Sequence, residues 1–160
     1  MYKVSERFDP ESVEWRNYKD SSCKEFRIDF DYSLLGYDIN IGRLDMMLRY
    51  PKNMGHCRRH RHIASTLTLV LEGEQYLIEQ LEDGTKKNIY RKKGDYAFAA
   101  ADALPHLEHG GPNGGIVLLS MQAQNDLLFE YFDENMENAW KVTIDQYIKS
   151  WNTNLAYGLK

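Results

Sequence analysis

Cysteines and long hydrophobic runs are scarce in this sequence, and each absence excludes a class of protein. The 160 residues include two cysteines, Cys23 and Cys57, which cannot build a disulfide framework and so favour a reducing compartment. No apolar run reaches about eighteen residues, which excludes a transmembrane helix. The N-terminal stretch MYKVSERFDPESVEW lacks the apolar core of a signal peptide. We therefore expect a cytoplasmic protein with no membrane partner.

An excess of positive charge is also lacking. The formal net charge is −4, which argues against a nucleic-acid partner, because such proteins carry basic patches that neutralise phosphates. Basic residues gather at two places, the first formed by Arg58, Arg59 and Arg61 and the second by Lys86, Lys87, Arg91, Lys92 and Lys93. We expect the second group to decorate the exposed strands of a hairpin as a solvated face. The first group lies among histidines.

Short segments with alternating apolar residues make up most of the chain. Hydrophobic residues account for 42%, enough for a core, and the candidates for it are Met47, Phe98, Leu119 and Met121. Strands are predicted at 25–32, 41–50, 59–63, 66–71, 75–81, 87–91, 96–100, 116–122 and 127–132, with turns at Gly36, Pro51, Glu72-Gly73, Asp83-Gly84, Lys93-Gly94-Asp95 and 110–115. Thr143 is predicted to cap a helix that runs through Trp151. Without repeats or linkers, residues 1–160 are expected to form one all-β domain, a sandwich or barrel.

The segment GHCRRHRHIASTLTLVLEG, residues 55–73, contains a His-X-His pair. In an extended strand, residues i and i+2 point to the same face, so His60 and His62 can converge on one point. A third histidine comes from the later segment LPHLEHGG, as His106 or His109. This pattern predicts an open site for a divalent metal, although imidazole ligands suit Fe(II), Zn, Ni and Cu alike. The alternative is a pair of surface histidines in a basic strand.

Other polar residues lie close to this motif. Cys57 could supply a thiolate, but its strand parity is opposite to that of the histidine pair, which favours a passive thiol. His56 shares the parity of the pair and is expected at the rim. Arg58 also shares it and could bind a substrate carboxylate or enolate oxygen bidentately, with a solvated arginine as the alternative. Glu108 could accept a hydrogen bond from a ligand histidine or lie in solvent.

Over residues 41–122 these motifs resemble the two motifs of the cupin superfamily. The first cupin motif has a glycine, His-X-His, a glutamate and a second glycine; the matching residues here are Gly55, His60, His62 and Gly73, with Thr66 or Leu67 at the glutamate position. The second motif is matched by Gly94 to Phe98 and by Leu104-Pro105-His106, with a gap about one residue longer than usual. The resemblance implies a single cupin (jelly-roll) β-barrel with a short C-terminal helix. It also implies His106 as the third ligand, with His109 as the runner-up.

Two groups of cupin dioxygenases come closer still. The stretch HRHIASTLTLVLEGEQY is similar to gentisate-type ring-cleaving dioxygenases, and the tail LLFEYFDENMENAWKVTIDQYIKSW is similar to the small single-cupin dioxygenases that cleave acetylacetone or dihydroxyacetophenone. Both groups hold a non-haem Fe(II) with three histidines and no glutamate. The missing glutamate therefore fits these groups better than it fits the general cupin pattern.

The resemblance implies a function. We expect a metal-dependent dioxygenase that uses Fe(II), or alternatively Zn, Ni or Mn, to cleave a C–C bond of a small diketone, hydroxyketone or hydroxylated aromatic with O2. The metal ligands would be His60, His62 and His106, and the candidate catalytic residues are His109 (as a proton shuttle), Arg58 and Glu108. A homodimer or higher homo-oligomer is expected by analogy. The alternatives are a non-catalytic metal- or ligand-binding cupin that acts as a sensor, and a cupin isomerase or lyase whose metal is a Lewis acid.

Overall fold

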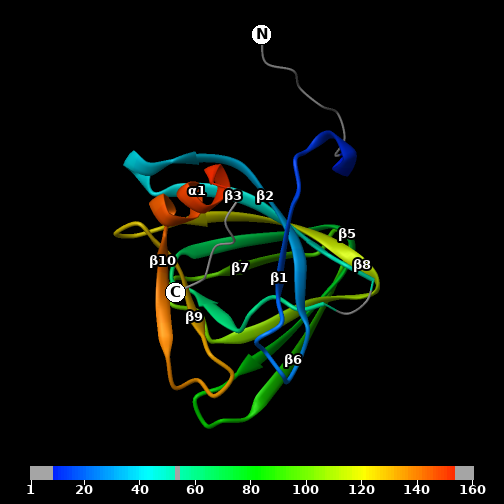
Figure 1. Ribbon diagram of the computed structural model, residues 1–160. Helices are drawn as coiled ribbons and strands as arrows, with labels where there is room; N and C mark the ends of the chain where they lie inside the picture. The colour runs from blue at the N-terminus through cyan, green and yellow to red at the C-terminus, as the bar shows by residue number, and fades with distance from the viewer. Residues whose placement is uncertain (1–8, 53–54, 154–160) are drawn as a thin grey trace.

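A computed structural model describes residues 9–52 and 55–153 of the chain. Its strands are β1 (Arg16–Asp20), β2 (Ile28–Asp38), β3 (Arg43–Tyr50), β4 (His60–His62), β5 (Ser65–Gln80), β6 (Lys86–Lys92), β7 (Tyr96–Ala99), β8 (His106–Gln122), β9 (Leu127–Phe132) and β10 (Ala139–Thr143). Two 3-10 turns, η1 (Pro10–Ser12) and η2 (Ile39–Ile41), and one α-helix, α1 (Ile144–Asn152), complete the described elements. Figure 1 shows that the strands form a sheet that curls on itself, with α1 at one end. The predicted all-β class with a short C-terminal helix is confirmed.

Strand β8 is the centre of the ten-stranded sheet. It pairs antiparallel with β3, with β4 and with β5. Strand β5 in turn pairs with β6 and β7. The beginning of β8 meets β4 where His106 lies opposite His60. This pairing joins the two histidine segments of the sequence.

The predicted turns at Glu72-Gly73 and at 110–115 are wrong, because β5 and β8 each run through these glycines as one long bent strand. Gly73 lies opposite Gly115 at a register shift in the β5–β8 pair. Gly73 has a φ of 62°, and a Cβ atom on either glycine would collide with the backbone of the other strand. Glycine here permits a β-bulge and a close approach of two strands rather than a chain reversal.

The core lies between the inner faces of the curled sheet and α1. Three of the four predicted core residues are buried, since Met47, Leu119 and Met121 are 1%, 1% and 0% exposed. The fourth prediction is wrong, because Phe98 is 62% exposed. It lies on β7, where exposed residues alternate with partly buried ones.

The C-terminal helix begins as predicted at Thr143. The Thr143 hydroxyl accepts a hydrogen bond from the Gln146 N–H at 3.2 Å, and the Gln146 side chain accepts one from the Thr143 N–H at 2.9 Å, which forms a capping box. Tyr147 is fully buried, and its ring lies 6.0 Å from that of Tyr32 on β2.

In the described part of the chain, no helix combines the length and the apolar character that crossing a bilayer requires. Strands β1 and β10 were not predicted, because both are short and mix polar with apolar residues.

Candidate metal centre

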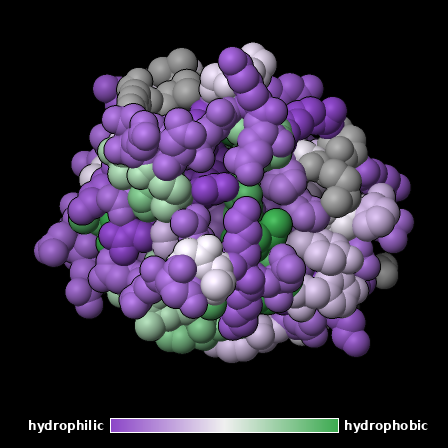
Figure 2. Space-filling model, turned by 90° about the horizontal axis from the view of Figure 1, so that it is seen from below, coloured by the Kyte–Doolittle hydropathy of each residue, from purple (hydrophilic) through white to green (hydrophobic). Residues whose placement is uncertain are grey.

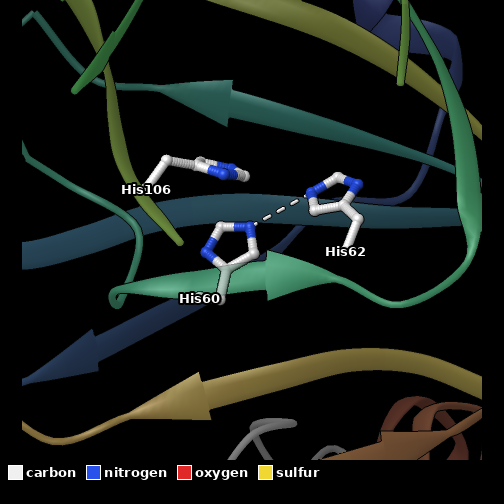
Figure 3. Close-up of side chains that lie close together, drawn as sticks. All are labelled: His60, His62 and His106. Carbon is white, nitrogen blue, oxygen red and sulfur yellow. Dashed lines mark hydrogen bonds between the residues drawn. The ribbon is translucent and has the colours of Figure 1, made fainter. Parts of the chain in front are cut away.

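Three buried histidines converge at the junction of β4 and β8. His60 and His62 come from β4, and His106 comes from the first position of β8. Their side chains are less than one-tenth exposed, and one nitrogen from each lies within 4.8 Å of the others. Figure 3 shows the three rings turned toward a common point. Of the two candidates for the third position, the structure brings His106, not His109, to the pair.

The three rings are held by hydrogen bonds at Nδ1. His60 Nδ1 lies 2.7 Å from the Arg58 carbonyl oxygen, and His106 Nδ1 lies 3.2 Å from the Leu104 carbonyl oxygen. Because a carbonyl only accepts, both Nδ1 atoms must carry the proton. Phe129 packs edge-on against the rings of both β4 histidines, with centroids 5.8 Å from His60 and 5.1 Å from His62. These contacts orient the rings before any ligand binds.

Thr66 gives His62 the same tautomer. The Thr66 hydroxyl donates to the Ala64 carbonyl oxygen at 3.0 Å and lies 2.8 Å from His62 Nδ1. Since the hydroxyl hydrogen is used, the hydroxyl oxygen accepts from Nδ1–H. Thr66, one of the two residues at the glutamate position in the cupin resemblance, therefore orients the His62 ring through its hydroxyl. All three Nε2 atoms therefore keep free lone pairs.

A divalent metal fits this arrangement. His60 Nε2 and His62 Nε2 lie 3.2 Å apart, and two lone pairs facing each other repel unless a cation lies between them. Nitrogen ligands about 2.1 Å from one ion and separated by this distance would subtend an angle of about 100°. In addition, the buried His106 Nε2 has no hydrogen-bond partner among the described residues.

The protonation states also suit a metal. Burial lowers the pKa of His62 well below its usual value, and the charges of His60, His106 and Arg91 lower it further. Burial and His60 likewise lower the pKa of His106 to about 4. Both imidazoles are therefore neutral at pH 7, which is the form that binds metals.

Glu108 follows His106 by two residues, lies on the same face of β8 and is 1% exposed. Burial alone would raise the pKa of its carboxyl group, but interactions led by those with His60 and His106 outweigh burial and lower it. One oxygen, Oε2, accepts a hydrogen bond from Gln75 Nε2 at 3.0 Å. The other, Oε1, lies 3.8 Å from His60 Nε2, and the buried Tyr50 hydroxyl and Cys57 thiol also interact with the carboxyl group and lower its pKa. The Glu108 carboxyl group thus faces the histidine cluster.

A cavity of about 480 Å³ opens onto this cluster. His62, His106 and Glu108 line it, together with Thr66, Thr68, Gln75, Leu77 and Glu79 of β5, Lys87, Ile89 and Arg91 of β6, and the segment 97–104. Thr66 and Thr68 alternate with Leu67 and Leu69 along β5, and it is the two threonines that line the cavity. The second basic group does not lie wholly in solvent as predicted, because Lys87 and Arg91 also face this space.

Two of the candidate catalytic residues are not brought to the cavity. The guanidinium of Arg58 makes an ion pair with Asp20 and lies 5.3 Å from the Trp140 ring centroid. It lines a separate depression of about 250 Å³. His109 is stacked on the Tyr76 ring at 5.3 Å. Neither Arg58 nor His109 lines the 480 Å³ cavity.

Cys57 and His56 also stay outside the ligand set. Cys57 is 3% exposed and belongs to the core, and the potential metal ligands in the described chain do not include it. The His56 ring lies 4.5 Å from that of His109.

Sequence reasoning missed the roles of Gln75 and Arg91. The signal that could have found them was the alternation of β5 and β6, which places every second residue of the hairpin on the cavity face.

Comparison with known structures identifies the fold. An acetylacetone dioxygenase from Acinetobacter johnsonii aligns with a TM-score of 0.63 and 12% identity over 96% of this chain and 93% of its own. A proposed acetylacetone dioxygenase from Methylibium petroleiphilum PM1 gives 0.64 and 13% over 94% and 97%. A cupin 2 conserved barrel domain protein from Rhodopseudomonas palustris gives 0.58 and 15% over 94% and 93%. The chain therefore has the cupin fold.

Sequence comparison alone adds nothing to this result. No protein-family model matches the chain, and no curated protein matches it.

Proposed function

Starting from the cupin fold and the three converging histidines, we propose that this protein is a non-haem Fe(II) dioxygenase. Its substrate would be a small diketone, hydroxyketone or hydroxylated aromatic, and its reaction the cleavage of a C–C bond with O2. The observation that supports the proposal is the set of three buried histidines whose Nδ1 atoms are anchored and whose Nε2 lone pairs face one point at the end of a cavity.

His60, His62 and His106 would hold the iron. Three neutral imidazoles leave its charge of +2 uncompensated, which favours an anionic, bidentate substrate such as an enolate. When bound, the iron would bring the deprotonated substrate and O2 together and lower the barrier to their reaction.

Glu108 is the group best placed to handle the proton that the substrate loses on binding. Its Oε1 lies 3.8 Å from His60 Nε2, and Gln75 fixes the carboxylate through Oε2. Interactions led by those with His60 and His106 lower the pKa of this carboxyl group despite its burial. Oε1 can therefore accept a proton inside a buried site, where general bases are effective.

Metal content is the first test. The wild type and His60→Ala are purified side by side without a metal-binding tag. We expect near-stoichiometric iron in the wild type, loss of iron in the variant, and a folded variant by circular dichroism. Zinc or nickel in the wild type, with no activity after anaerobic reconstitution with Fe(II), would favour Lewis-acid chemistry instead.

Oxygen uptake is the second test. Wild type loaded with Fe(II) should consume O2 with one of the candidate diketones or hydroxyaromatics, and His60→Ala should not. A metal-loaded protein that is stabilised by such compounds but never consumes O2 would favour the non-catalytic, ligand-binding alternative.

A further inference from the structure

Arg91 differs from the other arginines of the described chain in having no acidic partner. Every other described arginine has a carboxylate oxygen within 4.0 Å; the pairs are Arg16–Glu14, Arg27–Asp29, Arg43–Asp45, Arg49–Asp31, Arg58–Asp20, Arg59–Glu25 and Arg61–Asp102. Half-buried cations are normally paired, because desolvation of a charge is costly. Arg91 is half-buried and lines the same cavity as His62 and His106.

Gln75 holds Arg91 without neutralising it. Arg91 Nη1 donates to Gln75 Oε1 at 2.9 Å, and Gln75 Nε2 donates to Glu108 Oε2 at 3.0 Å. Because Gln75 is 1% exposed and hydrogen-bonded at both ends of its amide, it has a fixed orientation. It acts as a spacer between the cation and the carboxylate. One nitrogen of the guanidinium is used, and its other donors carry no hydrogen bond to a described residue.

The other basic residue that lines the cavity, Lys87, does have an acidic partner. Lys87 is on the same face of β6, but its ammonium group lies 3.9 Å from the Glu79 carboxylate. The cavity is also lined by apolar side chains such as Leu77, Ile89 and Ala97. The cavity thus has a site for a metal-binding group, an apolar wall and an unpaired guanidinium.

We propose that Arg91 binds a carboxylate of the substrate, so that the physiological substrate is an oxo or hydroxy carboxylic acid rather than a neutral diketone. The inference rests on the proposed function, since it assumes that the same molecule reaches the histidine cluster. A planar guanidinium binds a carboxylate through two parallel hydrogen bonds. The carbon skeleton between the two polar ends lies along the apolar wall.

Two diketones of matched size test this assignment. The probes are 4,6-dioxoheptanoate and heptane-2,4-dione, which differ by a carboxylate in place of a terminal methyl group. Their dissociation constants are measured by calorimetry with protein loaded with zinc, which does not turn over with O2, and with metal-free protein. The wild type is compared with Arg91→Gln, Arg91→Lys and Lys92→Gln; the last removes a charge from an exposed neighbour on the same strand.

We expect the wild type to bind the carboxylate at least ~10-fold more tightly than the neutral diketone, a typical gain for a charge-assisted pair. Arg91→Gln should remove this preference, Arg91→Lys should keep part of it, and Lys92→Gln should keep all of it. Equal affinity of the wild type for both probes, or a preference that survives in Arg91→Gln, would overturn the inference.

The same measurements separate this inference from the proposed function. If the preference depends on Arg91 but the Fe(II)-loaded protein never consumes O2, then the carboxylate site stands and the dioxygenase proposal fails. If O2 is consumed with neutral diketones alone and Arg91→Gln has no effect on binding, then the dioxygenase stands and the carboxylate site fails.

Discussion

Each face of β8 carries a histidine, but the two histidines have different surroundings. On one face, His106 and Glu108 point to the histidine cluster and its cavity. On the other, His109 lies parallel to the Tyr76 ring and 4.5 Å from the His56 ring, in a stack of aromatic side chains. Three positions separate the two histidines in sequence, yet one has a free ring nitrogen among potential ligands and the other packs between rings. Strand parity, rather than closeness in sequence, decides which of them can bind a metal.

The largest difference in metal affinity is expected between two variants, each of which lacks the histidine of one face. His106→Ala should weaken metal binding by more than ~100-fold, because the loss of a ligand costs more than the loss of a group that orients one. His109→Leu should leave the affinity within a few-fold of the wild type. Competition with a chromophoric chelator measures both. If His109→Leu lost the metal as fully as His106→Ala, the assignment of the two faces would be wrong.

A smaller effect is expected at Thr66, which touches the cluster only through His62. Thr66→Val keeps the shape of the side chain but removes the acceptor for His62 Nδ1–H. Metal affinity should fall by about 10–100-fold, as is usual when such a partner is lost. Thr68→Val is the matched control, since Thr68 lines the same cavity and no hydrogen bond joins it to a histidine. Equal affinities for the two valine variants would show that Thr66 does not orient the ring.

The smallest expected effect is a pH dependence of folding stability, which comes from His56 in the aromatic stack. Burial, with a contribution from His109, lowers the pKa of His56 to about 4. Its pKa in the unfolded chain is about 6.5, so the unfolded state takes up the proton first as the pH falls. Folding stability from this residue is therefore complete above pH 6.5 and is lost between pH 6.5 and 4.

Urea unfolding at several pH values checks this prediction. His56→Phe should lose less stability than the wild type between pH 6.5 and 4. We expect a difference on the order of 1 kcal/mol, because partial exposure of the ring screens the effect. Parallel pH profiles for the two proteins would contradict a neutral, partly buried His56.

The candidate metal centre was largely predictable, because its pattern is local. Alternation along one strand places His60 and His62 on one face whatever the rest of the chain does. The bends of β5 and β8 were not predictable, since glycine is equally suited to a turn and to a bulge. At Gly73 only the close approach of Gly115 distinguishes the two.

Arg58 and Arg91 show that sequence alone could not predict which arginine lines the cavity. Arg58 has the parity of the histidine pair, but its guanidinium is taken by Asp20, which lies far away in the sequence. Arg91 resembles a solvated hairpin residue in sequence. Its position opposite Gln75 in the β5–β6 register places it on the cavity face. Pairing register and distant partners are not encoded in the alternation of one strand.

The sequence by itself determined the type of ligand, the face that carries it and the all-β class, because side-chain chemistry and strand parity are local properties. Tertiary structure decided the rest. It brought His106 rather than His109 to the histidine pair, and it left Arg91 without an acidic partner among the described residues, in the cavity that His62 and His106 also line. These features arise when separate strands meet, so they depend on packing and register rather than on any single segment.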